Sequence, residues 1–151
     1  MNTIYVVGTP IGNLGDMTIR AIEILKNVDI ILSETPTVTM KMLNHFEIKK
    51  PVFSFFQNPN EKQIEDILKW LKEGKDLALV SEAGTPGVSD PGNKLINDIL
   101  LKNKDINIVP IPGASAIVSA ISVSGVNTQK FAFFGFVPKT KKNKFWKEIS
   151  D

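Results

Sequence analysis

The sequence predicts an α/β fold, with a mainly parallel five-stranded sheet and flanking helices. Two observations lead to this prediction. Four short runs rich in Val, Ile and Leu and one rich in Phe occur along the chain, and continuous apolar runs are typical of strands that are buried on both faces. The segments between these runs have the apolar spacing of amphipathic helices, and alternating strands and helices are typical of parallel sheets.

Five strands are expected, at residues 4–8, 29–33, 51–56, 76–81 and 106–111. The first three of them lie in the first half of the chain, together with two helices. Asp16 is the expected cap of the first helix. The apolar face of that helix consists of Ala21, Ile22, Leu25 and Val28. A short second helix is expected at residues 39–46.

The later helices have clearer boundary signals. Asn60 and Gln63 have the spacing of a capping box, and Gly74 is expected to end that helix. Its apolar stripe is Ile64, Ile67, Leu68 and Leu71. Asp90 is the expected cap of the next helix, with Pro91 at its first position. The buried face of that helix is Leu95, Ile96, Ile99 and Leu100, and a last helix is expected at residues 114–124.

The pattern changes after Gly125. Residues 130–137 are rich in aromatics and predict a further strand, and a lysine-rich segment with helical character follows. We therefore expect one α/β domain over residues 1–125, and the beginning of a truncated second α/β domain over residues 126–151.

The composition excludes several classes of protein. The chain has 151 residues and no cysteine, so disulfides and thiolate metal sites are excluded. His45 is the only histidine, which argues against a histidine-ligated metal, and no metal is expected. The net charge of +2 does not by itself indicate nucleic-acid binding. No signal segment or membrane-spanning run is found, so a cytoplasmic protein is expected.

Three loops rich in Gly and Pro follow expected strands, at residues 8–16, 81–92 and 110–116. Ligands of open α/β sheets bind at the carboxyl ends of the strands, where these loops lie. Glycine lets a backbone approach a ligand closely, although each loop alone is equally well explained as a tight packing turn. Together they favour a ligand held by main-chain groups. None matches a dinucleotide or phosphate-binding fingerprint.

The loop motifs resemble the ribosomal RNA small-subunit methyltransferase I group of the tetrapyrrole-methylase superfamily. The matching segments are Thr9-Pro-Ile-Gly-Asn-Leu-Gly-Asp16, Leu43-Asn-His-Phe46, Val80-Ser-Glu-Ala-Gly-Thr-Pro86, Ser89-Asp-Pro-Gly92 and Pro112-Gly-Ala-Ser-Ala116. The resemblance runs in register from about Thr3 to Val137. It implies two α/β domains with S-adenosylmethionine in the cleft between them, a homodimer, and 2′-O-methylation of a cytidine ribose in small-subunit ribosomal RNA.

The resemblance also implies roles for individual residues. The cofactor-binding residues would be Pro10, Ala83, Gly84, Thr85, Val88, Ser89, Ser115 and Ala116. The sequence departs from the group's pattern after the second strand, where Glu-Asp-Thr-Arg is replaced by Glu34-Thr-Pro-Thr37. Glu82 also stands where Asp is usual, and Phe55-Phe56 replaces a Tyr-His pair. The substrate is therefore less firmly indicated than the cofactor.

Several side chains have both a catalytic and a structural interpretation. Glu34 is the candidate for deprotonating or orienting the ribose hydroxyl, against a solvated loop carboxylate. Asp16 and Asp90 are better explained as helix caps, and His45 as a partly buried structural residue. One set among Phe53, Phe55 and Phe56 is expected in the core, although aromatics also stack on bases.

Lysines supply the candidate RNA contacts. They are Lys41, Lys141 and Lys142, the last two in a run that also contains Phe145 and Trp146. Lysines neutralise phosphates, although a lysine run is as often a solvated helix face. Two alternative functions remain open from the sequence. One is a methylase of the superfamily that acts on a small molecule, and the other is a cofactor- or RNA-binding fragment without turnover.

Overall fold

The computed structural model describes residues 3–55 and 59–150. Its strands are β1 (Thr3–Val7), β2 (Ile30–Ser33), β3 (Val52–Ser54), β4 (Leu77–Val80) and β5 (Asn107–Ile111). Its helices are η1 (Leu14–Asp16), α1 (Ile19–Asn27), α2 (Pro36–His45), α3 (Glu61–Lys72), α4 (Gly92–Lys102), α5 (Ala116–Ser122) and α6 (Lys142–Ser150). The five strands expected from the sequence are all present.

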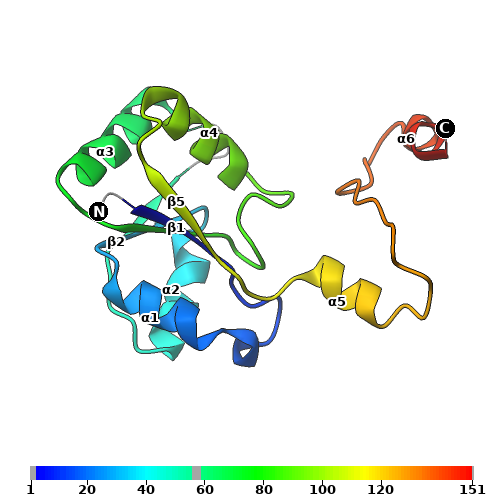
Figure 1. The fold of residues 1–151 in the computed structure, drawn as a ribbon, viewed down its shortest axis with the longest axis horizontal. Coiled ribbons are helices and arrows are strands. Elements are labelled where there is room, and N and C mark those ends of the chain that lie inside the picture. The colour runs from blue at the N-terminus through cyan, green and yellow to red at the C-terminus, as the bar shows by residue number, and fades with distance from the viewer. Residues whose placement is uncertain (1–2, 56–58, 151) are drawn as a thin grey trace. The chain divides into compact units, whose positions relative to one another are not determined.

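The strands form one sheet in the order β3-β2-β4-β1-β5, and every neighbouring pair is parallel. The predicted parallel α/β fold is confirmed. Helices α1 and α2 cover one face and α3 and α4 the other (Figure 1). Each face has its own core, because the central strands are buried on both sides: Ile4 and Leu79 pack with α3 and α4, whereas Val7 and Ile31 pack with α1 and α2.

The helix boundaries show which local signals were decisive. The capping box of Asn60 and Gln63 is present at the start of α3, and Gly74, with φ +83°, follows its end. The expected cap Asp16 was wrong: it belongs to η1, and the hydroxyl of Thr18 caps α1 by accepting from the N–H of Ala21 at 3.1 Å.

Helix α2 begins three residues before the expected start, at Pro36, because proline suits the first turn of a helix. The backbone of Pro91 caps α4 in place of the expected Asp90 side chain, so the helix begins at Gly92. The carboxylate of Asp90 still serves the helix start, since it accepts a hydrogen bond from the N–H of Gly92 at 2.8 Å.

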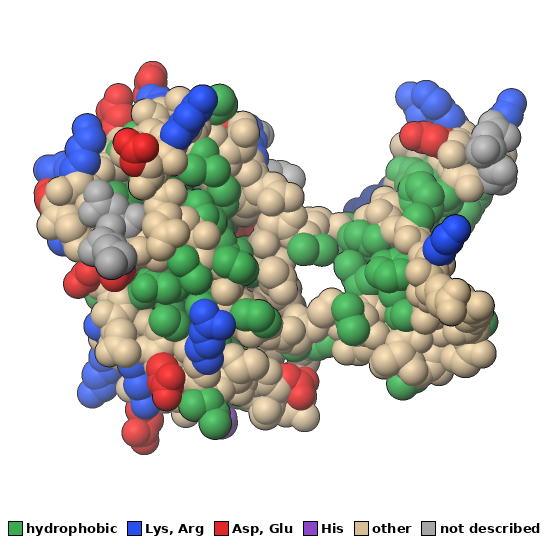
Figure 2. Space-filling view, in the orientation of Figure 1, with side chains coloured by type: hydrophobic (Ala, Val, Ile, Leu, Met, Phe, Trp, Pro, Cys, Tyr) green, Lys and Arg blue, Asp and Glu red, His purple; other side chains and the backbone are tan. Residues whose placement is uncertain are grey.

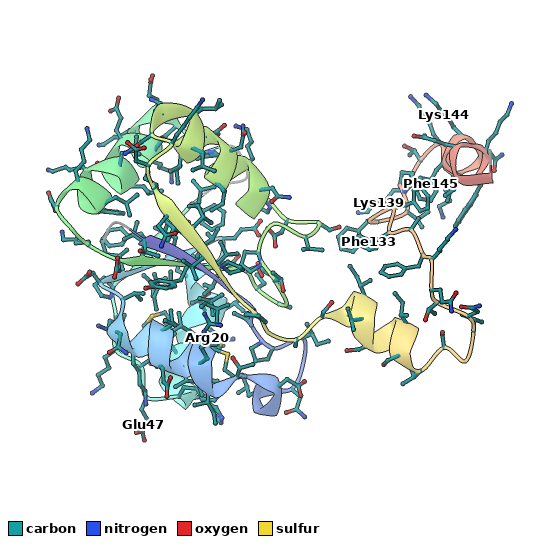
Figure 3. The ribbon with its side chains drawn as sticks, in the orientation of Figure 1. Arg20, Glu47, Phe133, Lys139, Lys144 and Phe145 are labelled. Carbon is teal, nitrogen blue, oxygen red and sulfur yellow. The ribbon has the colours of Figure 1, made fainter. Side chains whose placement is uncertain are left out.

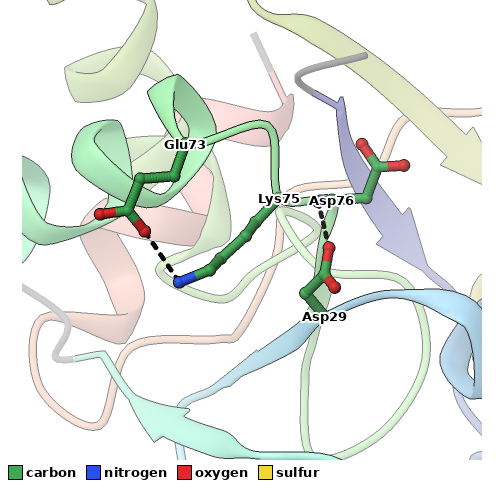
Figure 4. A network of polar contacts seen from close by, with 4 residues as sticks. All are labelled: Asp29, Glu73, Lys75 and Asp76. Carbon is green, nitrogen blue, oxygen red and sulfur yellow. Dashed lines mark hydrogen bonds and ion pairs between the residues drawn. The ribbon is translucent and has the colours of Figure 1, made fainter.

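Hydrogen bonds between segments far apart in the sequence also fasten the amino edge of the sheet (Figure 4). The carboxylate of Asp76, before β4, accepts from the N–H of Thr3 at 3.1 Å. The carboxylate of Asp29, before β2, accepts from the N–H of Asp76 at 2.8 Å, and Asp29 donates its own N–H to the carbonyl of Asp76. Lys75 pairs with Glu73 beside them at 2.8 Å. These bonds join the starts of β1, β2 and β4.

The chain divides into two compact units, Met1–Ala116 and Ile117–Asp151. The boundary expected near residue 125 stays a prediction. In the second unit, α6 confirms the helix expected in the lysine-rich segment. The strand expected at residues 130–137 was wrong. No strand of the described chain pairs with this segment, and Gly135 at φ +72° interrupts an extended backbone.

Candidate functional site

The carboxyl ends of four strands are aligned at one edge of the sheet. Val7 at the end of β1 is in register with Val80 of β4 and Ile111 of β5, and Val80 is in register with Ser33 of β2. The loops that follow these strands therefore start side by side. Ligands of open α/β sheets bind at this edge.

The loops after β1 and β4 are bonded to each other through Thr9 and Gly84. The N–H of Thr9 donates to the carbonyl of Gly84 at 2.9 Å, and the N–H of Gly84 donates to the carbonyl of Thr9 at 3.1 Å. Two buried hydroxyls reinforce this bridge, since Thr9 Oγ1 and Ser81 Oγ each lie 3.2 Å from the carbonyl oxygen of Gly84. The carbonyl of Gly84 is thus held by three donors and points into the protein.

The loops after β1 and β5 are in direct backbone contact at Gly8 and Gly113. A Cβ added to Gly8 would lie 2.8 Å from the nitrogen of Gly113, and one added to Gly113 would lie 2.7 Å from the carbonyl oxygen of Gly8. Both are closer than side-chain atoms pack, so glycine is required here for close approach. Together with the Thr9–Gly84 bridge, this contact joins the three loops that the sequence singled out.

The bridge leaves two main-chain donors of the β4 loop without a partner. Among the described residues, the N–H groups of Ala83 and Thr85, on either side of Gly84, make no hydrogen bond. Ala83 is exposed and Thr85 is half-buried. Both main-chain groups of Gly84 itself are used internally. The loop can therefore offer the amides of Ala83 and Thr85 to a ligand, and Gly84 between them has φ +79°, a left-handed backbone that favours glycine.

The rest of the β4 loop is held tightly although it is exposed. One carboxylate oxygen of Asp90 accepts from the N–H groups of Gly87 at 2.6 Å and Gly92 at 2.8 Å. Between them, Ser89 has a left-handed backbone with φ +60°, which is uncommon for a residue with a side chain. Val88 and Ser89 both present exposed side chains. A strained residue kept in place by surrounding bonds is frequent at ligand sites.

Glu34 follows β2 at the same edge and is half-buried. Burial, followed by repulsion from the carboxylates of Glu82 and Asp90, raises its pKa above the ordinary value for glutamate. These interactions place Glu34 among the acidic groups of the β4 loop. A carboxylate with a raised pKa is a stronger base when ionised, which suits proton transfer.

Four side chains that the sequence did not predict as site residues hold this edge together: Thr9, Ser81, Thr35 and Glu82. Thr9 and Ser81 tie Gly84, as described above. Thr35 donates from its hydroxyl to the carboxylate of Glu82, which links the loop after β2 to the loop after β4. Each of the four lies within two residues of a strand end, which is the sequence signal that could have identified them.

The other predicted site residues are more scattered. Pro10 is buried behind the bridge, and Ser115 and Ala116 end the β5 loop, at the last positions of the first unit. Lys41 is exposed on α2, whereas Lys141 and Lys142 belong to the second unit, whose labelled Lys139, Lys144 and Phe145 are shown in Figure 3. Of the predicted RNA contacts, Lys41 belongs to the first unit and Lys141 and Lys142 to the second.

The structural predictions for the phenylalanines near β3 and for His45 had different outcomes. Phe55 is buried in the core, and Phe53 is 42% exposed with its ring 4.6 Å from that of Trp70; Phe56 lies outside the described residues. The expected partial burial of His45 was wrong, because its ring stands exposed at the end of α2 against the edge of Phe46. A cavity of about 500 Å³ near there, lined by Asn44, Glu47, Ile48 and Lys49, lies away from the loops.

Over residues 3–55 and 59–150, no group of three or more His, Asp or Glu side chains is arranged to hold a metal ion. Within the same residues, no helix has the length and apolar character needed to cross a membrane.

The family model described as tetrapyrrole (corrin/porphyrin) methylases matches residues 3–151. The chain belongs to this family. Its fold agrees: the methyltransferase CobJ superposes with a TM-score of 0.66 at 17% identity, covering 97% of this chain and 61% of that one. Cobalt precorrin-4 methyltransferase CbiF gives 0.61 at 16% identity, covering 93% of this chain and 62% of that one. At these identities the likeness shows the shared tetrapyrrole-methylase fold alone.

Relatives within the tetrapyrrole-methylase family are much more similar in sequence. A protein of Thermotoga maritima named ribosomal RNA small subunit methyltransferase I is 47% identical over 144 residues, which are 95% of this chain and 64% of the relative. The proteins of that name from Leptospira biflexa and Bacillus subtilis are 43% and 44% identical, over 93% and 95% of this chain and 58% and 49% of their own lengths. The chain thus spans about half to two thirds of these relatives.

Proposed function

We propose that this chain forms the S-adenosylmethionine-binding part of a methyltransferase that acts on small-subunit ribosomal RNA, at the 2′-oxygen of a cytidine. The observation that supports this most is the 43–47% identity, over nearly the whole chain, to relatives named ribosomal RNA small subunit methyltransferase I. The solved tetrapyrrole methylases share the fold at only 16–20% identity, so a small-molecule substrate has less support.

The sheet edge fits a flat ligand with hydrogen-bonding groups. The free N–H groups of Ala83 and Thr85 supply donors, and the close contact of Gly8 with Gly113 keeps side chains out of the edge beside them. In the proposed site, Pro10 forms the floor, and the remaining contacts come from Val88, Ser89, Ser115 and Ala116. Gly84 acts on the ligand through the turn that it imposes.

Positioning carries most of the catalytic burden in methyl transfer. S-adenosylmethionine supplies a methyl group on a sulfonium, which needs no metal to be reactive. The protein has to align the accepting oxygen with that methyl group and remove the hydroxyl proton. Glu34 is the proposed group for the proton, because it lies at the same edge, is half-buried and has a raised pKa.

RNA binding is proposed for exposed lysines on two separate parts of the chain. Lys41 lies on α2 in the first unit, and Lys141 and Lys142 precede or begin α6 in the second. Exposed lysines gain by neutralising phosphates and releasing counterions. A homodimer and a cytoplasmic location complete the proposal, both in line with an enzyme of ribosomal RNA.

The proposal is tested first by titrating the chain with S-adenosylmethionine in a calorimeter. Gly84→Val should weaken binding at least tenfold, about 1.4 kcal/mol, because valine disfavours a left-handed backbone and its side chain would press on Ile11, which an added Cβ already approaches to 3.5 Å. Gly74→Val, which imposes the same backbone penalty at another left-handed glycine (φ +83°) after α3 and outside the proposed site, is the matched control. Failure of the parent chain to bind would contradict the cofactor assignment.

The second test is methyl transfer to isolated small ribosomal subunits with labelled S-adenosylmethionine. Label at a cytidine 2′-oxygen is the expected result, and Glu34→Gln should lower the turnover about 100-fold or more if this carboxylate takes the proton. Label that appears only on a tetrapyrrole acceptor would replace the RNA proposal with the small-molecule one.

A further inference from the structure

Thr35 is the N-cap residue of α2, but its side chain does not cap the helix. Its carbonyl begins the helix, accepting from the N–H groups of Val38 at 3.0 Å and Thr39 at 3.2 Å. Its side chain makes no capping hydrogen bond. Threonine is favoured at this position because its side-chain oxygen accepts from a free N–H of the first turn. This helix therefore lacks that stabilisation, and the hydroxyl has another partner.

That partner is the carboxylate of Glu82, 47 positions further along the chain. Thr35 follows β2 and Glu82 follows β4, and these strands are neighbours in the sheet. Glu82 directly precedes Ala83, Gly84 and Thr85. The bond consequently joins the proposed cofactor loop to the segment after β2 that contains Glu34.

Both ends of this bond are anchored to the sheet. On the β2 side, the buried hydroxyls of Ser33 and Thr39 lie 2.6 Å apart and hold the first turn of α2 against the strand end. On the β4 side, the buried hydroxyl of Ser81 bonds to the carbonyl of Gly84. A bond between two anchored residues restrains the loop, whereas a bond between two mobile side chains would restrain little.

We propose that Thr35 and Glu82 form a latch that fixes the orientation of the loop from Ala83 to Thr85. They are positioning residues: they keep the free N–H groups of Ala83 and Thr85 aimed in one direction before any ligand arrives. A ligand then meets a preorganised loop and does not have to order it. The consequence for S-adenosylmethionine rests on the proposed function, but the restraint on the loop does not.

The restraint is measured in the free 151-residue chain by amide hydrogen exchange, read by NMR at the N–H of Gly84, which is bonded to the carbonyl of Thr9. The decisive variant is Thr35→Asp. Aspartate caps a helix at least as well as threonine, so α2 keeps its start, but at neutral pH it cannot donate to Glu82 and repels it. The exchange rate of the Gly84 amide should rise about fivefold, which corresponds to about 1 kcal/mol. A hydrogen bond to a charged acceptor is stronger than this, but the Glu82 carboxylate is exposed, which reduces its contribution.

Reversing the polarity of the pair should repair the latch. In the double variant Thr35→Asp with Glu82→Gln, the new side-chain amide donates to the new carboxylate, and exchange should return to within about twofold of the parent. Thr37→Asp is the control for charge: it places the same carboxylate in the same first turn, at an exposed threonine. Its exchange rate at Gly84 should match the parent.

Three results would overturn the latch: no change in Thr35→Asp, no recovery in the double variant, or an equal rise in Thr37→Asp. Titration with S-adenosylmethionine then tests the consequence, with binding about fivefold weaker in Thr35→Asp and recovered in the double variant. A parent chain that does not bind S-adenosylmethionine would contradict the proposed function, whereas the exchange rates would still decide the latch.

Discussion

The contact between Gly8 and Gly113 gives the most direct prediction about stability. In Gly8→Ala the new methyl group would lie 2.8 Å and 2.9 Å from the nitrogen and Cα of Gly113, which are backbone atoms and cannot rotate away. Gly8 is not among the glycines with a left-handed backbone, so alanine fits its conformation and only the missing space opposes it. The loops after β1 and β5 must therefore separate.

Two effects of opposite sign set the magnitude. Overpacking a well-filled contact costs about 1–3 kcal/mol. Replacing glycine with alanine also restricts the unfolded chain, which stabilises the fold by about 0.4–1 kcal/mol. Overpacking is the larger effect, and a net loss of about 1–2 kcal/mol is expected. With a urea m-value of about 2 kcal/mol per molar, the middle of the usual range of about 1–3, the unfolding midpoint should fall by about 0.5–1 M.

The assay is urea unfolding followed by the fluorescence of Trp70, in a Trp146→Phe background so that the signal reports on the first unit. Gly15→Ala is the matched control, because its new methyl group would meet only the Asn13 side chain, whose nearest atom lies 3.2 Å away. The control should stay within about 0.5 kcal/mol of the parent. A Gly8→Ala variant as stable as that control would refute the close-contact argument.

Three further predictions concern charge and exposed surface. The pKa of Glu34 is raised in the folded protein, so this residue contributes stability at low pH that is lost as the pH rises through that pKa. In urea unfolding, the free energy of unfolding of Glu34→Gln should therefore increase relative to that of the parent as the pH goes from about 4 to about 7. A difference that stays constant over this range would contradict the prediction. Lys141→Ala with Lys142→Ala should flatten the log–log salt dependence of ribosomal RNA binding by about 0.7–0.9 per lysine, whereas an unchanged slope would make these lysines a solvated surface. Large apolar side chains are exposed along one segment of the second unit (Figure 2): Phe131, Phe133, Phe134 and Phe136. The chain should therefore self-associate at high concentration in sedimentation, and a strictly monomeric profile would contradict this.

The fold was predictable where a signal depends on neighbours in the chain. Continuous apolar runs specified the strands, and the reciprocal capping of Asn60 and Gln63 specified the start of α3. Residues 130–137 show the limit of such signals. Their aromatic composition suits a strand, but a strand also needs a hydrogen-bonded neighbour, and composition says nothing about whether one is present.

The site was predictable in its place but not in its bonding. Gly/Pro loops after strands indicated the edge, and the topology brought them together. The sequence did not show that Gly84 uses both of its main-chain groups on Thr9, because that depends on β1 and β4 being adjacent in space although the two residues are 75 positions apart in the chain. The Thr35–Glu82 bond was hidden for the same reason.

The hydrogen bonds of Asp29 and Asp76 form a clasp at the amino edge, and this clasp gives the two ends of the sheet different tolerances to substitution. There, Asp76 and Asp29 fasten three strand starts through bonds to main-chain N–H groups, at the end of the sheet opposite to the functional loops. Substitutions in this clasp can therefore change how long the molecule survives heat or proteolysis without altering what it recognises. A lineage under pressure to adapt to a new temperature could adjust one end of the sheet and leave the chemistry of the other end untouched.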